Sequence, residues 1–177
     1  MENAHVAERP TGLPAEEKPV AKAVRASASL DMVSVRFQSF SANAFRSALE
    51  LPDHFALQPK IGFTRPVVRH SGLHVSIATT VVFSADAELP EEGRTPVASI
   101  RASIEILYQK KQDVQDIAEA DLQEFANINA PFHAWGYWRE FVQSSLARLN
   151  LPSYSLPMFR VTDVPKLMIE GDEEHVD

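Results

Sequence analysis

The run at residues 73–83 constrains the fold more than any other part of the sequence. It reads LHVSIATTVVF, with apolar residues mostly at odd positions and small or polar residues mostly at even positions. Successive side chains of a strand point to opposite faces of a sheet, so this period of two predicts a strand that is buried on one face. Residues 100–108 repeat the pattern, and residues 85–96 between them contain two prolines and a glycine. We therefore expect an antiparallel pair joined by a loop.

Two further segments alternate in the same way. Residues 32–40 set Val33, Val35 and Phe37 against polar neighbours, and residues 60–68 alternate more weakly. Alternation over this length is typical of half-buried strands. The sequence thus predicts four strands, which we expect to follow one another as a meander.

Helical spacing begins only after these strands. Residues 121–128 carry apolar side chains three and four apart and predict a short helix, and a stronger helix is predicted from Pro131 to the Leu151-Pro152 pair. Its apolar stripe comprises Phe132, Trp135, Trp138, Phe141, Val142, Leu146 and Leu149. This order predicts an α+β fold, in which a four-stranded antiparallel sheet is followed by a long helix packed on one face.

A single helix cannot cover both faces of such a sheet, and this helix is unusually aromatic. Ordinary core packing would account for most of its large rings, but apolar surface that remains at this scale usually meets a partner. We therefore expect a homo-oligomer. The predicted interface residues are Phe132, Trp135, Trp138 and Phe141.

The two ends of the chain differ in composition from the middle. Residues 1–29 are rich in Ala, Pro, Glu and Lys without an aromatic residue, and we expect a disordered arm there. Residues 165–177 begin with a short apolar patch and end in an acidic run, which predicts a solvated tail. The folded domain is expected over residues 30–164.

Charge and composition exclude several function classes. The chain has 17 Lys and Arg against 24 Asp and Glu, a net charge of −7, and so no basic stripe for a nucleic-acid backbone or an anionic membrane. It has no cysteine for a disulfide, a thiolate nucleophile or a cysteine-based metal site. None of its six glycines forms a phosphate-binding loop. We expect a cytoplasmic protein without a cofactor, because no signal sequence or membrane-spanning run is visible.

The candidate catalytic residues favour structural roles over chemistry. His70 and His74 resemble a metal pair, but four residues along a strand separate side chains by about 13 Å. His133 has no nucleophile motif beside it, and a packed or interface histidine is the better interpretation. The acidic groups at Glu91-Glu92 and at residues 113–121 are expected in solvated segments. The sequence therefore predicts no metal site, no catalytic residue and no enzyme.

Two motifs give the sequence a family resemblance. The helix contains Trp135, Tyr137, Arg139 and Glu140 within AWGYWRE, and LPSYSLP follows at residues 151–157. Together with the strand order, these segments resemble the SecB protein-export chaperones, whose helix typically reads Phe-Pro-Tyr-x-Arg-Glu before a Phe-Pro-x-Leu-x-Leu-x-Pro segment. The resemblance covers about residues 30–159.

The resemblance implies a cytoplasmic, ATP-independent holdase that binds unfolded polypeptides or preproteins in apolar grooves and assembles as a dimer of dimers. It also implies the SecA translocation motor as a partner through the acidic tail. By the family pattern, the client-binding residues are Phe40, Phe45, Phe55, Tyr154 and Phe159. Extended clients of this kind bind through apolar side chains and backbone hydrogen bonds, which requires no catalytic group.

The sequence departs from the family pattern at two places. Gly136 replaces the usual proline, and the Asn-Phe-Asp-Ala-Leu-Phe motif that opens the family's second helix is replaced by residues 160–165, with Pro165 as a helix breaker. A SecB-like chaperone devoted to one client, such as an antitoxin, is therefore an alternative. A non-chaperone oligomeric binding module is the rival from another class, followed by an enzyme that uses His70, His74 or His133.

Overall fold

The protein was analysed as a computed structural model that describes residues 17–47, 53–71, 74–89, 95–112 and 116–160. Within these ranges no helix is both long and apolar enough to cross a membrane. The predicted acidic tail at residues 165–177 lies outside the described residues, as do Glu91-Glu92 and residues 161–165, which replace most of the family's second-helix motif.

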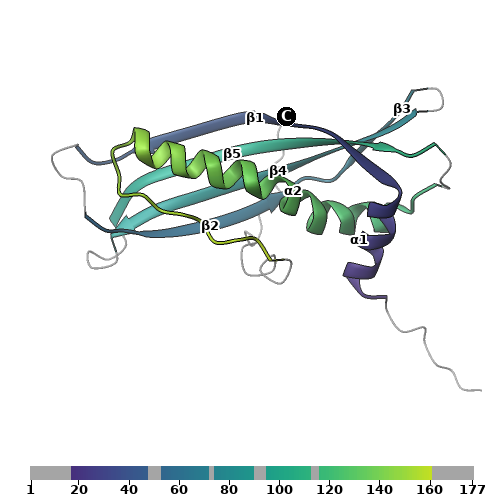
Figure 1. Cartoon of the computed structure of the whole chain (residues 1–177), viewed down its shortest axis with the longest axis horizontal. Helices are drawn as coiled ribbons and strands as arrows, with labels where there is room; N and C mark the ends of the chain where they lie inside the picture. Colours follow the sequence, from purple (N-terminus) through teal and green to yellow (C-terminus); the bar gives the residue numbers. More distant parts are fainter. Residues whose placement is uncertain (1–16, 48–52, 72–73, 90–94, 113–115, 161–177) are drawn as a thin grey trace, which may run out of the picture.

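The centre of the fold is a five-stranded antiparallel sheet whose two longest strands form a hairpin (Figure 1). The strands are β1 (Leu30–Ala44), β2 (Ala56–Phe63), β3 (Val67–Ser71), β4 (His74–Leu89) and β5 (Thr95–Lys110). The predicted antiparallel pair of β4 and β5 is confirmed, with Val81 opposite Ile104. The α+β class is confirmed as well, since a long helix follows the sheet.

The predicted meander is wrong. The order across the sheet is β1-β5-β4-β2, and the first strand therefore pairs with the last one instead of with its neighbour in sequence. Alternation reports that a segment is half-buried, but it contains no information about which strand lies beside it. Partner choice is made by contacts between residues far apart in the chain.

The weakly alternating segment at residues 60–68, predicted as one strand, contributes to two strands. Both β2 and β3 pair with the same edge of β4, with Phe63 opposite Val81 and Val67 opposite Ala78. Pro66 lies between the two strands and has no N–H to give to a ladder. The backbone N–H of Thr64 still donates to the carbonyl of Thr80 at 3.1 Å.

One continuous helix, α2 (Glu119–Arg148), lies across one face of the sheet (Figure 1). The sequence predicted two helices with Pro131 at the start of the second one. A proline inside a helix costs about 3 kcal/mol because it removes a hydrogen bond and crowds the preceding turn. Here Ala130, Pro131 and Ala134 are all buried, and the packing of this stretch against the core keeps the helix continuous.

The core lies between α2 and the sheet, and it contains two of the predicted interface residues. The indole of Trp138 stacks on Phe83 with ring centroids 5.3 Å apart and planes 11° apart, and Trp135 tilts against the same ring at 6.0 Å. Trp138 is 0% and Trp135 4% exposed within the single chain. Side chains buried this far have no surface to offer a second copy, so the interface prediction is wrong for both tryptophans.

The predicted disordered arm is wrong for its last third. Residues Pro19–Ala28 form a helix, α1, which packs against α2 with Ala23 and Ala26 buried (Figure 1). The prolines of residues 1–29 contributed to the prediction of disorder, but Pro19 occupies the first turn of α1, where its missing N–H costs nothing. Residues 1–16 lie outside the described residues.

Candidate functional site

An aromatic group lies on the β1 side of α2, and we name it the β1-side cluster. It consists of Phe37, Phe40 and Phe141, with ring centroids 5.4 to 6.1 Å apart. Phe40 makes two of these contacts and is nevertheless 68% exposed. Aromatic pairs at such separations contribute to stability, but an exposed ring of this size also presents a large apolar surface to solvent.

A bulge in β1 brings these rings to one face of the sheet. Residues three apart in a regular strand point to opposite faces, so Phe37 and Phe40 would be separated. The register shifts between Phe37 and Ser39, and this leaves Phe37 opposite Ile104 and Phe40 opposite Ala102, two residues of β5 that both face the core. The extra residue in the bulged strand therefore aims both rings toward α2.

Exposed apolar side chains continue along β1 on either side of this cluster. Met32 and Val33 precede it, and Phe45 follows the strand with its backbone N–H donating to the carbonyl of Val97 at 2.8 Å. All three side chains are more than half exposed. In the described part of the chain, β1 pairs only with β5, so its second edge carries no strand. An edge with free backbone groups and apolar side chains is suited to another extended chain.

A second aromatic group, the β2-side cluster, lies on the other side of α2. Phe55 and Tyr154 approach to 6.2 Å, and Trp135 and Phe159 approach to 5.2 Å. Residues 151–160, which run back beside β2 after the helix ends, supply Tyr154 and Phe159 (Figure 1). The indole N–H of Trp135 donates to the carbonyl of Pro157 at 2.9 Å and holds this segment in place.

Arg139 adds two further contacts to the returning segment. Its guanidinium donates to Ser155 Oγ at 3.3 Å and lies 3.2 Å from Met158 Sδ. Met158 itself is 71% exposed, which makes it the most exposed large apolar side chain among those described. The motif residues Trp135 and Arg139 therefore position the segment that follows the helix.

The five predicted client-binding residues thus fall into two groups that the structure does not bring together. Phe40 and Phe45 are exposed on the β1 side, whereas Phe55 and Tyr154 are half-buried on the β2 side. Phe159 is only 8% exposed against Trp135 and belongs to the core. A client-binding role stays a prediction for the other four residues.

Of the predicted interface residues, Phe132 and Phe141 keep accessible surface. Phe132 is 57% exposed on the outer side of α2, and Phe141 is half-buried in the β1-side cluster. Tyr137, a residue of the family motif on the same helix, is 46% exposed. An interface role for Phe132 and Phe141 stays a prediction.

Phe37, which is half-buried against the core, was missed as a member of the β1-side cluster. The alternation of residues 32–40 indicated that Phe37 faces the core. Phe37 and Phe40 share a face only because of the bulge between them.

The histidines singled out in the sequence occupy two different environments. His70 and His74 are both exposed, on β3 and on the first residue of β4, so they lie on neighbouring strands instead of along a single one. His74 Nδ1 lies 3.1 Å from Gln109 Nε2. Among the described residues, no three His, Cys, Asp or Glu side chains gather in a way that could hold a metal ion.

His133 packs against Tyr108, which is one of the two roles predicted for it. Its Nδ1 lies 2.9 Å from the phenol oxygen of Tyr108, which joins α2 to β5. Burial lowers the pKa of His133 below its ordinary value of 6.5, and burial likewise raises the pKa of Tyr108. Both groups are therefore neutral near pH 7, and the pair is a neutral hydrogen bond.

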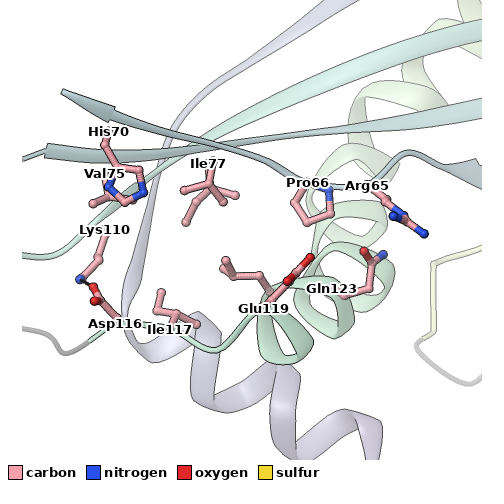
Figure 2. Close-up of a pocket in the computed structure, with 12 residues that line it drawn as sticks. Arg65, Pro66, His70, Val75, Ile77, Lys110, Asp116, Ile117, Glu119 and Gln123 are labelled. Carbon is pink, nitrogen blue, oxygen red and sulfur yellow. Dashed lines mark hydrogen bonds and ion pairs between the residues drawn. The ribbon is translucent and has the colours of Figure 1, made fainter. Parts of the chain in front are cut away.

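A pocket of about 420 Å³ lies between the β3–β4 hairpin and the start of α2 (Figure 2). At one end, Lys110 Nζ donates to Asp116 at 2.7 Å, and this hydrogen bond lowers the pKa of the Asp116 carboxyl. Its lining is mainly apolar, with charged groups around the rim. The lining residues are Arg65, Pro66, Val68, His70, Val75, Ile77, Lys110, Asp116, Ile117, Glu119, Leu122 and Gln123.

Comparison with known proteins gives a structural match but no match in sequence. No family model and no curated protein matches the sequence. The structure aligns with the Mycobacterium tuberculosis Rv1957 SecB-like chaperone, solved in complex with a ChAD peptide from the Rv1956 HigA1 antitoxin. The TM-score is 0.63 at 18% identity, over 79% of this chain and 97% of that chain. A Streptococcus agalactiae protein of unknown function aligns with a TM-score of 0.37 at 10% identity, over 72% of this chain and 96% of that one, and it carries no argument. The chain therefore has the SecB-like fold.

Proposed function

We propose that this protein is an ATP-independent holdase of the SecB type, which binds unfolded or preprotein clients on apolar surface and keeps them unaggregated. The observation that carries the proposal is the exposure of large aromatic side chains beside a free strand edge, at Phe40 and Phe45 along β1. The SecB-like fold of the chain supports the same conclusion.

The physical basis is the burial of apolar surface without chemistry. Covering one large apolar side chain is worth about 1.5–3 kcal/mol, so a client that covers several rings binds without an energy source. The free edge of β1 adds backbone hydrogen bonds to any extended sequence, which makes binding tolerant of sequence. An unfolded chain offers both features, whereas a folded protein has buried them.

The finer assignments follow from the same proposal. We place the holdase in the cytoplasm as a homotetramer, a dimer of dimers with Phe132 and Phe141 near the contact between subunits. The acidic residues 165–177 are the proposed contact with the SecA motor. Their charge is suited to a basic partner surface.

Light scattering tests the proposal. A chemically unfolded client is diluted into buffer without nucleotide, with and without the protein. Suppression of scattering near one oligomer per client is expected, and the double variant Phe40→Ser, Phe45→Ser should suppress it clearly less. Val24→Ser, at a 60% exposed position on α1, is the matched control and should behave as wild type. No suppression of any client by the wild type would contradict the proposal.

A second candidate is a chaperone dedicated to one client. The observation in its favour is that the structurally similar Rv1957 chaperone is bound to a peptide from an antitoxin. A dedicated chaperone would suppress aggregation of its own client but not of unrelated unfolded proteins. A panel of unrelated clients therefore separates the two candidates.

A further inference from the structure

The sheet edge opposite β1 has an unusual charge. No Asp or Glu occurs at residues 54–85, although the chain carries a net charge of −7. The same stretch contains Lys60, Arg65 and Arg69, all exposed. It includes β2 and β3, which pair only with β4 in the described part of the chain. This edge therefore combines free backbone groups with positive charge.

The pocket of Figure 2 lies directly beside this edge. Val68 and His70 of β3 face it, together with Val75 and Ile77 of β4, and Ile117 closes it from the approach to α2. A strand that pairs with β3 would direct every second side chain to this same side of the sheet. Those side chains would meet apolar lining, so apolar residues fit these positions.

Arg69 determines what fits on the opposite side. Because Arg69 lies between Val68 and His70 in a strand, its side chain is directed to the face away from the pocket. The facing residue on β4 is Ser76, which brings no compensating charge. Opposite charges directly across a strand pair contribute about 0.2–1 kcal/mol, so acidic residues fit the alternate positions.

Lys110 provides a second positive group at the pocket rim. Its side chain is 14% exposed, whereas the side chain of its partner Asp116 is 98% exposed. Lys110 and Asp116 compensate each other's charge at this end of the pocket, so the apolar residues of a bound peptide remain the ones directed there. Glu119 at the start of α2 also lines the pocket. A carboxylate of the peptide would be repelled there, so apolar peptide residues fit this part of the pocket better.

We propose that the outer edge of β3 and the adjoining pocket bind an extended peptide that alternates apolar and acidic residues, by adding it to the sheet as a further strand. This inference rests on the proposed function, because it makes the edge a subsite for a particular class of client segment. It is independent of the β1-side cluster, which lies at the opposite edge of the sheet.

Fluorescence anisotropy of labelled peptides tests the inference. The probe Glu-Val-Glu-Leu-Glu-Val-Glu-Leu is compared with the same peptide in which Lys replaces every Glu. One favourable charge pair at Arg69 in place of an unfavourable one predicts about 2- to 30-fold tighter binding of the acidic peptide by the wild type. Equal affinity for the two peptides, or binding of neither, would overturn the inference.

Two variants locate the binding. Arg69→Glu should abolish the preference for the acidic peptide, and Val68→Trp should weaken both peptides by filling the pocket. The matched control is Arg101→Glu, which makes the same charge change on β5, where the Arg101 side chain is 60% exposed. Equal weakening by Arg69→Glu and Arg101→Glu would indicate a general effect of net charge and overturn the placement. Circular dichroism confirms that each variant is folded.

The same samples separate this inference from the proposed function. The Arg69→Glu variant should suppress aggregation of an unfolded client as well as the wild type does, because the β1-side cluster is intact. Loss of the peptide preference with aggregation suppression retained supports both statements. Suppression without peptide binding overturns only the subsite, and peptide binding without suppression overturns only the holdase.

Discussion

Trp138 and Phe40 show how similar residue types acquire opposite roles in this chain. Both are large aromatic side chains that contact Phe141, at 6.2 Å and 5.5 Å. Trp138 is sealed between α2 and Phe83, whereas Phe40 is 68% exposed. Removal of the first should therefore affect stability, and removal of the second should affect binding.

Trp138→Ala is expected to lower the free energy of unfolding by about 3–5 kcal/mol, because it leaves a cavity under α2. Tyr137→Ala, at a 46% exposed position of the same helix, is the matched control and should cost much less. Urea unfolding measures both values. If Trp138→Ala left the free energy of unfolding unchanged but reduced the native mass, Trp138 would lie at a subunit interface and not in the core.

The Tyr108–His133 pair predicts a pH dependence of stability. Because burial lowers the pKa of His133 in the folded state, the unfolded chain binds a proton more readily than the folded protein does. This contribution is complete above about pH 6.5, and it is lost as the pH falls from there toward the folded pKa. His133→Gln should therefore show a smaller loss of stability between about pH 7.5 and pH 5.5 in urea unfolding. Parallel losses in the variant and the wild type would contradict the assignment.

At the scale of elements, Arg25 joins α1 to α2 through an ion pair with Asp121. Arg25 donates to both carboxylate oxygens of Asp121 at 2.7 Å, and it also contacts Glu17 at 2.6 Å. The Asp121 side chain is 9% exposed because Arg25 and α1 cover it at the surface of the molecule. The hydrogen bonds from Arg25 lower the pKa of Asp121, so the pair stabilises the protein at neutral pH and is lost as the pH falls below the usual carboxyl range near 3.8.

Arg25→Met should release α1 from α2, because it leaves the covered Asp121 carboxylate without its partner. Hydrogen exchange should speed up for the amides of Pro19–Ala28 and not for those of β4 and β5. The charge-neutral change Val24→Ser on the exposed side of α1 is the control. Unchanged exchange in α1 after Arg25→Met would show that the contacts of Ala23 and Ala26 alone hold the helix.

The elements also show what sequence patterns can predict. Period-two alternation identified β1, β4 and β5, because each buries one face against α2. The pattern did not identify their order, and it missed the bulge after Phe37, because the inserted residue shifts the phase of the alternation by one and so resembles the end of the pattern. A helix was predicted to begin at Pro131, which in fact lies inside α2, and disorder was predicted around Pro19, which in fact begins α1. A proline's effect depends on its position in a helix and on the packing around it. The family motif correctly indicated the SecB-like fold.

For the candidate site, the sequence supplied residue types and the fold supplied exposure. Phe40 and Phe159 are the same residue type, yet Phe40 is exposed on an edge strand and Phe159 is packed against Trp135. The pocket beside β3 draws on the β3–β4 hairpin, the end of β5 and the start of α2, so no local pattern could indicate it. Only the absence of acidic residues at 54–85 was visible in advance.

At the scale of the whole molecule, the two edges of the sheet differ in chemistry. The β1 edge is apolar and aromatic, with Phe40 and Phe45 exposed, and the β2–β3 edge is basic beside an apolar pocket. α2 lies between them over one face (Figure 1). A client long enough to reach both edges would contact aromatic side chains at the β1 edge and positive charge at the β2–β3 edge.

The most direct test of the central claim compares one client in its unfolded and folded forms. Isothermal titration calorimetry in nucleotide-free buffer measures the affinity of this protein for a client that a destabilising substitution keeps unfolded, and for the folded wild-type client. We predict binding of the unfolded form with a negative heat-capacity change, as apolar burial requires, and no binding of the folded form. Equal affinity for both forms, or no binding of either, would contradict the assignment of this protein as a holdase.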